Sequence, residues 1–220
     1  MSTPEKPKGN KTREQWIAEG KAYWYARRDM QAMFCFEQAL RIDQTGAFGL
    51  AVRGLALHSI QRDQEALPNF EEALQLDPNE ALAWFGKGNS LWTLERYEEA
   101  LPAFQQALRL VPNDYHTWYG WSNTLLGLKR FEEALAGFKQ ALQLDPKDGP
   151  AWHGKASALL NMRRFEEALV AYKQSLQMDA SNGIGWYNYA TTLEMLGRAD
   201  EARKARETAR TLGYSGPAPS

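Results

Sequence analysis

Apolar and polar residues along the chain follow a helical period, and the whole pattern returns every 34 residues. The segment RYEEALPAFQQALRLVPND at 96–114 is followed at 130–148 by RFEEALAGFKQALQLDPKD. A fixed period of this length indicates a repeat architecture before any local feature is considered. Counted from Arg13, the units run without insertion over 13–46, 47–80, 81–114, 115–148, 149–182 and 183–214. We expect the polar ends, 1–12 and 215–220, to be disordered.

Each unit predicts two helices. Unit positions 4, 8, 11 and 14 are apolar or small and form one face of the first helix. In the second helix we expect positions 20, 21, 24, 27, 28 and 30 to be buried. Paired glutamates favour its positive N-terminal end, and proline at position 32 ends it in the middle units. Alanine at position 20 of every unit and a small residue at position 8 predict close contact between the two helices.

The last unit differs on one face. Positions 21, 24 and 28 are apolar in the first five units, but here they are Arg203, Arg206 and Arg210. The opposite face stays apolar, with Ala202, Ala209 and Leu212. A terminal repeat needs a polar outer surface so that no further copy stacks on it, and we interpret this unit as a cap. The alternative is a phosphate-binding patch, which the interspersed Asp200, Glu201 and Glu207 make less favourable.

Composition narrows the class of function. The 220 residues carry a net charge of −1, which gives no general attraction to nucleic acid or to an anionic membrane. No apolar run reaches the roughly 18 residues of a membrane span. The N-terminal sequence has no apolar signal-peptide core, and the single cysteine, Cys35, fits a reducing compartment. These features predict a cytoplasmic protein without membrane insertion.

No pattern typical of catalysis stands out. The chain contains no phosphate-binding loop, no G-x-S-x-G and no H-E-x-x-H. Its three histidines lie in different units, without the local spacing of metal ligands. Cys35 has no histidine in a recognisable relation to it, so we expect a small buried residue there. The sequence therefore predicts a protein that is not an enzyme and holds no metal or cofactor.

The repeated pattern W–x–x–x–G–x–x–L … A–x–x–x–F–x–x–A … P resembles the tetratricopeptide repeat family over residues 13 to about 214. The departures are Leu50 at a tryptophan position and Gln44 and Ala180 at proline positions. The resemblance implies an all-α, right-handed superhelical solenoid of six helix-turn-helix repeats. It further implies that the first helices line a concave groove and that the protein binds a peptide or another protein without catalysis.

By the same resemblance, positions 2, 5, 9 and 12 face the groove. Aromatic and polar amide side chains dominate that stripe, whereas charges are sparse, and exposed apolar surface of such extent usually marks a binding site. The candidate peptide-binding residues are Trp24, Phe48, Leu82, Phe85, Asn89, Trp92, Tyr119, Asn123, His153 and Tyr187. Among them Phe85, Trp92 and Tyr119 are the expected anchors, in the middle of the array. The alternative for any single aromatic residue is that it extends the core between neighbouring repeats.

Family members that bind acidic chaperone tails use lysine at position 5, and this chain has none there. That absence disfavours a chaperone-tail partner. Another branch uses an asparagine ladder at position 6, where this chain has Gly86, Gly120 and Gly154 and only Asn188 fits. One hypothesis is that these glycines let a ligand backbone approach closely. We interpret the chain as a protein- or peptide-binding adaptor or scaffold. The alternative is a structural subunit that is permanently docked in a larger assembly or self-assembles through the edges of the array.

Overall fold

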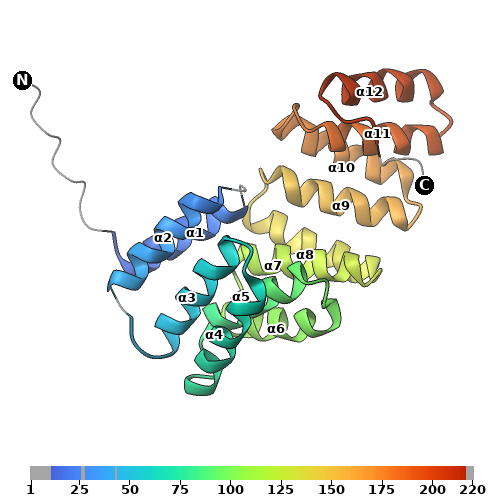
Figure 1. Ribbon diagram of the computed structural model, residues 1–220. Coiled ribbons are helices and arrows are strands. Elements are labelled where there is room, and N and C mark those ends of the chain that lie inside the picture. Colours follow the sequence, from blue (N-terminus) through green and yellow to red (C-terminus); the bar gives the residue numbers. More distant parts are fainter. Residues whose placement is uncertain (1–10, 26–27, 43, 217–220) are drawn as a thin grey trace, which may run out of the picture. The chain divides into compact units, whose positions relative to one another are not determined.

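The computed structural model describes residues 11–216 apart from 26–27 and 43. In this part of the chain, all regular secondary structure is α-helical (Figure 1). Residues 1–10 and 217–220, for which we expected disorder, lie outside the described residues. The helices are α1 (Arg13–Tyr25), α2 (Asp29–Ile42), α3 (Gly46–Ser59), α4 (Asp63–Leu76), α5 (Ala81–Thr93), α6 (Tyr97–Leu110), α7 (Tyr115–Gly127), α8 (Phe131–Leu144), α9 (Gly149–Asn161), α10 (Phe165–Met178), α11 (Gly183–Met195) and α12 (Ala199–Thr211). None of the described helices is long and apolar enough to cross a membrane.

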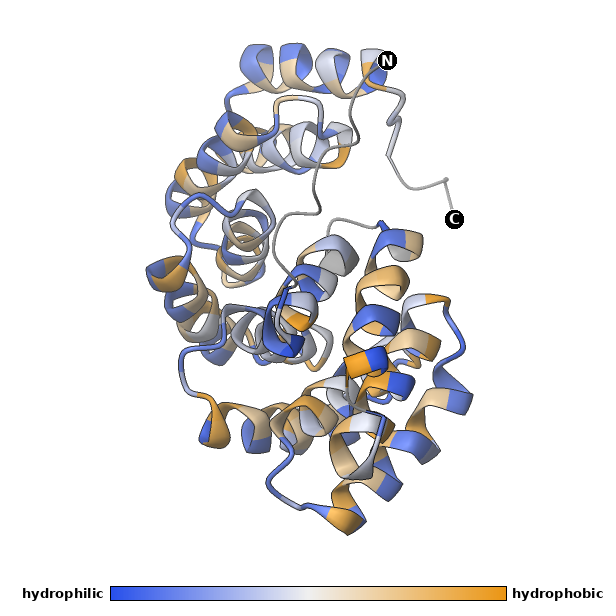
Figure 2. Ribbon diagram, turned by 90° about the vertical axis from the view of Figure 1, so that its left-hand side faces the viewer, coloured by the Kyte–Doolittle hydropathy of each residue, from blue (hydrophilic) through white to orange (hydrophobic). Residues whose placement is uncertain are grey.

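Two compact units divide the chain, with α1–α6 in residues 1–112 and α7–α12 in residues 113–220. In the first unit, α1/α2, α3/α4 and α5/α6 form helix hairpins, and successive hairpins pack through α2 on α3 and through both α3 and α4 on α5. In the second unit, α7/α8, α9/α10 and α11/α12 repeat this arrangement, through α8 on α9 and α10 on α11. Most helices in both units carry hydrophilic and hydrophobic residues side by side, as expected when one face packs (Figure 2).

Several glycines of the first helices lie against an aromatic ring of a second helix. Phe70 of α4 is completely buried and lies against both Gly54 of α3 and Gly86 of α5. A Cβ atom at Gly86 would come within 2.2 Å of that ring, and one at Gly154 within 2.3 Å of Phe138. The hypothesis that Gly86 and Gly154 admit a ligand backbone is therefore wrong, because a neighbouring ring occupies the space. These glycines let one helix hairpin pack closely on the next.

One predicted part of the core is exposed. The side chains at position 30 were expected to be buried, but most of them lie near the end of a second helix with 40–62% of their surface accessible. The exposed members are Ile42, Leu76, Leu144, Met178 and Leu212. The alanine, serine and aromatic side chains at positions 20, 24 and 27 are buried in the first five hairpins, as predicted. The ends of these second helices are thus left partly accessible.

Polar residues at the same repeat position cap four of the first helices. The side chains of Glu80, Asp114, Asp148 and Asn182 each accept a hydrogen bond from a backbone N–H in the first turn of the following helix. This N-cap role was not recognised from the sequence, although acidic or amide residues recur at position 34. At the start of the second helices, an arginine pairs with the glutamate three residues later, from Arg62–Glu65 through Arg198–Glu201.

Candidate peptide-binding surface

The candidate residues of the first unit divide into buried and partly exposed groups. Phe85 is only 1% exposed, and the Lys21 ammonium lies 4.0 Å from the centre of its ring. Asn89 is also buried, and its Nδ2 donates to the Phe85 carbonyl oxygen at 2.9 Å. Leu82 is buried as well, so all three match the alternative in which these residues extend the core. We therefore assign none of them a direct ligand contact.

Phe48 and Trp92 are the candidate residues of the first unit that present partly exposed side chains. The Arg13 guanidinium lies 4.2 Å from the centre of the Phe48 ring. Trp92 lies near the end of α5, seven residues after Phe85 and therefore on a similar side of the helix. The side chain of Trp24 lies outside the described part of the structure. Trp92 is thus the expected central anchor that the first unit leaves accessible.

In the second unit, Tyr119, Asn123, His153 and Tyr187 are all partly exposed. Tyr119 stacks on Tyr115, with ring centres 6.2 Å apart and planes 21° apart, and it forms a T-shaped contact with the Phe138 ring. The stacking partner Tyr115 was not selected from the sequence, because its position 1 is polar or small in most other repeats. The two tyrosines, one turn apart on α7, together form a larger aromatic surface than Tyr119 alone.

His153 combines aromatic and polar contacts. Its ring meets Tyr172 edge to face at 5.2 Å, and its Nε2 lies 3.3 Å from Asn188 Nδ2, which donates to it. This contact links α9 to α11 within the second unit. Burial lowers the pKa of His153, so its ring is neutral at pH 7. A neutral ring beside an amide suits a polar, uncharged ligand group better than a carboxylate.

A buried Ser–His–Asp cluster in the first unit does not have a catalytic arrangement. His58 Nδ1 contacts both Asp63 Oδ1 and Ser90 Oγ, the latter at 3.2 Å. A serine nucleophile needs the histidine to engage serine and aspartate through different ring nitrogens. All three side chains are also at most 4% exposed, which excludes a substrate. The cluster joins α3, α4 and α5.

Among the described residues, no group of three His, Cys, Asp or Glu side chains is placed to hold a metal ion, and Cys35 is buried as expected.

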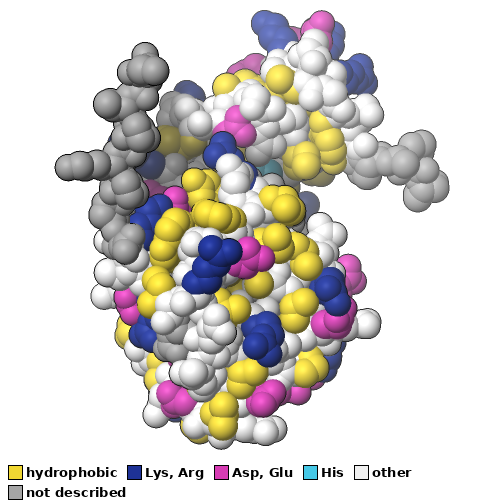
Figure 3. All heavy atoms as spheres, turned by 60° about the vertical axis from the view of Figure 1, so that its left-hand side comes forward, with side chains coloured by type: hydrophobic (Ala, Val, Ile, Leu, Met, Phe, Trp, Pro, Cys, Tyr) yellow, Lys and Arg dark blue, Asp and Glu magenta, His cyan; other side chains and the backbone are white. Residues whose placement is uncertain are grey.

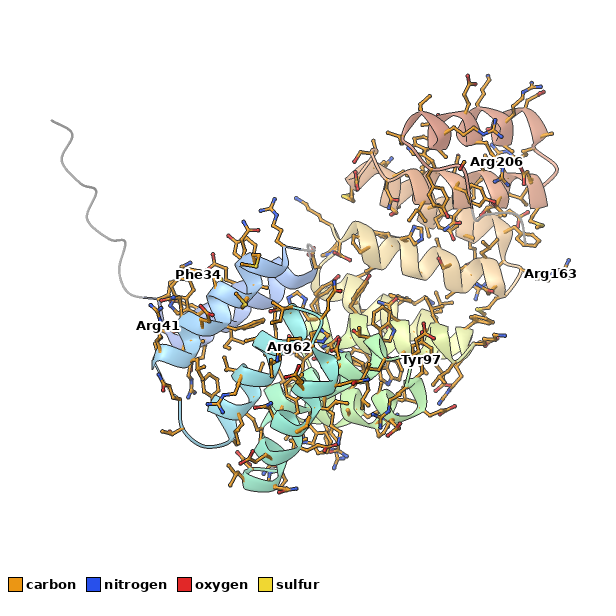
Figure 4. All side chains as sticks on the ribbon, in the orientation of Figure 1. Phe34, Arg41, Arg62, Tyr97, Arg163 and Arg206 are labelled. Carbon is orange, nitrogen blue, oxygen red and sulfur yellow. The ribbon has the colours of Figure 1, made fainter. Side chains whose placement is uncertain are left out.

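Two arginines of the last helix, Arg203 and Arg206, pair with neighbouring carboxylates. Arg206 extends from α12 toward α11, where its two nitrogens bond the Glu194 carboxylate at 2.7 and 2.9 Å (Figure 4). Arg203 pairs with Asp200 at 2.7 Å. Leu212 is 40% exposed, so its expected inward position is wrong, whereas Ala202 and Ala209 are buried. The paired arginines favour a polar cap over a site that binds phosphate.

Comparison with known proteins agrees with this architecture. A family model described as tetratricopeptide repeat matches residues 53–115, 85–149 and 153–213. The structure of MamA (residues 41 to the end) from Desulfovibrio magneticus RS-1 is 19% identical, covers 78% of this chain and 97% of that chain, and has a TM-score of 0.71. The structure of PilF from Pseudomonas aeruginosa is 22% identical, covers 93% of this chain and 93% of that chain, and has a TM-score of 0.70.

A third structure, YrrB, is 25% identical over 80% of this chain and 91% of that chain, with a TM-score of 0.67, and is described as a TPR protein with an unusual peptide-binding site. No curated protein sequence matches this chain. MamA and PilF, at lower identity, support the fold alone. Because the family model matches more than half of the residues, the chain belongs to the tetratricopeptide repeat family.

Proposed function

We propose that this protein is a non-catalytic cytoplasmic adaptor, without cofactor or metal, that binds an extended segment or a short helix of another protein. The observation that carries the proposal is a set of partly exposed aromatic and amide side chains on successive first helices. These are Phe48, Trp92, Tyr119, Asn123, His153 and Tyr187.

The chemistry of these side chains supports a peptide ligand. Rigid aromatic rings supply large contact areas at low entropic cost, and amide groups hydrogen-bond a peptide backbone. Few charged residues occur on these stripes, so affinity depends on apolar burial more than on long-range attraction. YrrB provides a further argument, since a relative of the same fold is described as having a peptide-binding site.

A displayed random-peptide library tests the proposal directly. Peptides selected on the full chain are re-measured against Trp92→Ala and Tyr119→Ala. Truncating a central aromatic anchor commonly costs about 2 kcal/mol, so we expect a roughly thirtyfold weaker Kd. The matched control is Val170→Ala, at an exposed position on the second helix α10. Selected peptides that bind both anchor variants as tightly as the wild type, but lose affinity for the control, would move the site to the second helices.

A second candidate is a structural subunit that docks permanently in a larger assembly. The observation that favours it is the number of exposed apolar side chains on second helices, including Phe34 and Val170 in addition to the position-30 residues. On the face seen in Figure 3, hydrophobic side chains lie scattered among charged ones. Sedimentation of the isolated chain distinguishes the two functions, because a monodisperse monomer supports the adaptor. Concentration-dependent association that Phe34→Ser removes would support the subunit.

A further inference from the structure

The C-terminal segment lies against α11 through Tyr214 and Gly216. α12 ends at Thr211, and the N–H groups of Gly213 and Tyr214 then donate to the carbonyl oxygens of Arg210 and Ala209, both at 2.9 Å. Gly213 has φ +83°, a left-handed conformation that glycine adopts without strain. These bonds turn the chain toward the start of α11.

Two residues of the segment contact the same ring. Tyr214 meets Tyr187 edge to face, with centres 5.4 Å apart and planes at 80°. Gly216 follows at φ +95°, and a Cβ atom there would come within 2.5 Å of Tyr187 Cε2. The Cβ of Tyr214 in turn lies 2.9 Å from the Cβ position of Gly183, so that residue also has to be small. An aromatic residue followed two residues later by glycine is thus fitted closely to this surface.

The surface is held in place independently of the segment. Arg206 lies 4.2 Å from the centre of the Tyr187 ring, and its bidentate bond to Glu194 fixes the guanidinium. In the other hairpins of the second unit, the residue equivalent to Arg206 is Phe138 or Tyr172, which contacts Tyr119 or His153 from inside the repeat array. In the last repeat Arg206 takes that position, and Tyr214 of the C-terminal segment also contacts Tyr187.

We infer that Tyr187, with Gly183 and Arg206, forms a docking site for an extended peptide segment that carries an aromatic residue followed two residues later by glycine. Tyr214–Gly216 occupies this site within the same chain. The inference rests on the proposed adaptor function and specifies part of the ligand. A partner that uses this end of the array has to displace the C-terminal segment.

The test uses the full chain and a defined probe, the acetylated peptide TLGYSGPAPS corresponding to residues 211–220. Gly216→Val forces the segment off Tyr187, because valine neither adopts φ +95° easily nor fits beside the ring. Ser215→Ala, at an exposed neighbouring residue, is the matched control. The probe is titrated into each ¹⁵N-labelled protein, and amide shifts in α11 are followed.

We expect saturable shifts in Gly216→Val with a Kd of about 0.1 mM or below. A short tether gives the competing segment an effective concentration of about a millimolar, roughly ten times that Kd. Wild type and Ser215→Ala should bind the probe at least about tenfold more weakly. A probe with Tyr214→Ala should not bind. A second full-length variant, Tyr214→Ala, should expose the site in the same way, and circular dichroism confirms that each protein is folded.

Equal binding of the probe by all proteins would overturn the inference, because the segment would then not compete. If the probe bound neither Gly216→Val nor Tyr214→Ala, the inference would also be overturned, and only a packing role would be left for Tyr214. Both results are distinguishable from failure of the adaptor function, which is measured with other peptides and at Trp92 and Tyr119.

Discussion

Asp148 illustrates how one side chain determines where a helix begins. Its carboxylate accepts a hydrogen bond from the Ala151 N–H in the first turn of α9. Burial raises the pKa of Asp148, and bonds from Tyr115 and Ala151 oppose that shift. Asn182 caps α11 in the same way, accepting from the Gly185 N–H at 2.9 Å, so charge is not essential to the role.

We therefore expect Asp148→Ala to lower the free energy of unfolding by about 1 kcal/mol. Asp148→Asn should cost much less, because the amide oxygen accepts the same bond. Urea denaturation followed by circular dichroism measures both. Equal losses for the two variants would show that the negative charge, and not the cap geometry, stabilises the helix.

His153 predicts a pH dependence of stability. Because burial lowers its pKa, the unfolded chain binds a proton more readily than the folded chain does. Its contribution to stability is therefore complete above the ordinary histidine pKa of about 6.5 and is lost as the pH falls below that value. His153→Gln should reduce the difference in denaturation midpoint between pH 7.5 and 5.5. An unchanged difference would mean that other groups cause the pH dependence.

At the scale of the helix, the turn between the two helices contains a left-handed residue in the second to sixth repeats. Gln61, Glu95, Lys129 and Arg163 have φ between 57° and 63°, whereas the last turn has Gly197 at 72°. This conformation costs a non-glycine residue roughly 1–2 kcal/mol. The turn nevertheless forms, because its N–H groups bond the carbonyls of the preceding helix, as Lys129 N does with Leu126 O.

Lys129→Gly should consequently stabilise the second unit by about 0.5–1 kcal/mol, after allowance for the greater freedom of glycine in the unfolded chain. Lys129→Ala is the matched control, since it removes the side chain but keeps the strain, and we expect no gain from it. The midpoint of urea denaturation distinguishes the two. A gain from alanine equal to that from glycine would attribute the effect to the lysine side chain.

The helices could be predicted from the sequence, but the burial or exposure of individual candidate residues could not. Period and residue type predict which face of a helix packs, so the buried alanines at position 20 followed directly. Whether Phe85 faces a ligand or the core depends on neighbouring groups that the pattern does not show, such as Lys21 over its ring. The contact between the C-terminal segment and Tyr187 could not be predicted either, because it depends on the backbone path after α12.

At the scale of the whole molecule, we propose that the polar last helix limits the length of the array. Arg203, Arg206 and Arg210 occupy the positions that are apolar in the other repeats. Changing all three to leucine would recreate a stacking surface, and we expect concentration-dependent association by light scattering. The control is a triple lysine variant, which keeps the charge and should remain monomeric. A leucine variant that also remains monomeric would contradict the capping role.

The tryptophans at position 4 offer a means of observing the array from within. The indole N–H of Trp84 donates to the Pro78 carbonyl at 2.8 Å, and those of Trp152 and Trp186 donate to Pro146 and Ala180 at 2.9 Å. Each indole is therefore tied to the end of the preceding hairpin. Separation of two hairpins breaks that bond and changes the solvation of the ring. The emission spectrum of a variant that retains one of these tryptophans would then report, without any added label, the order in which neighbouring repeats come apart.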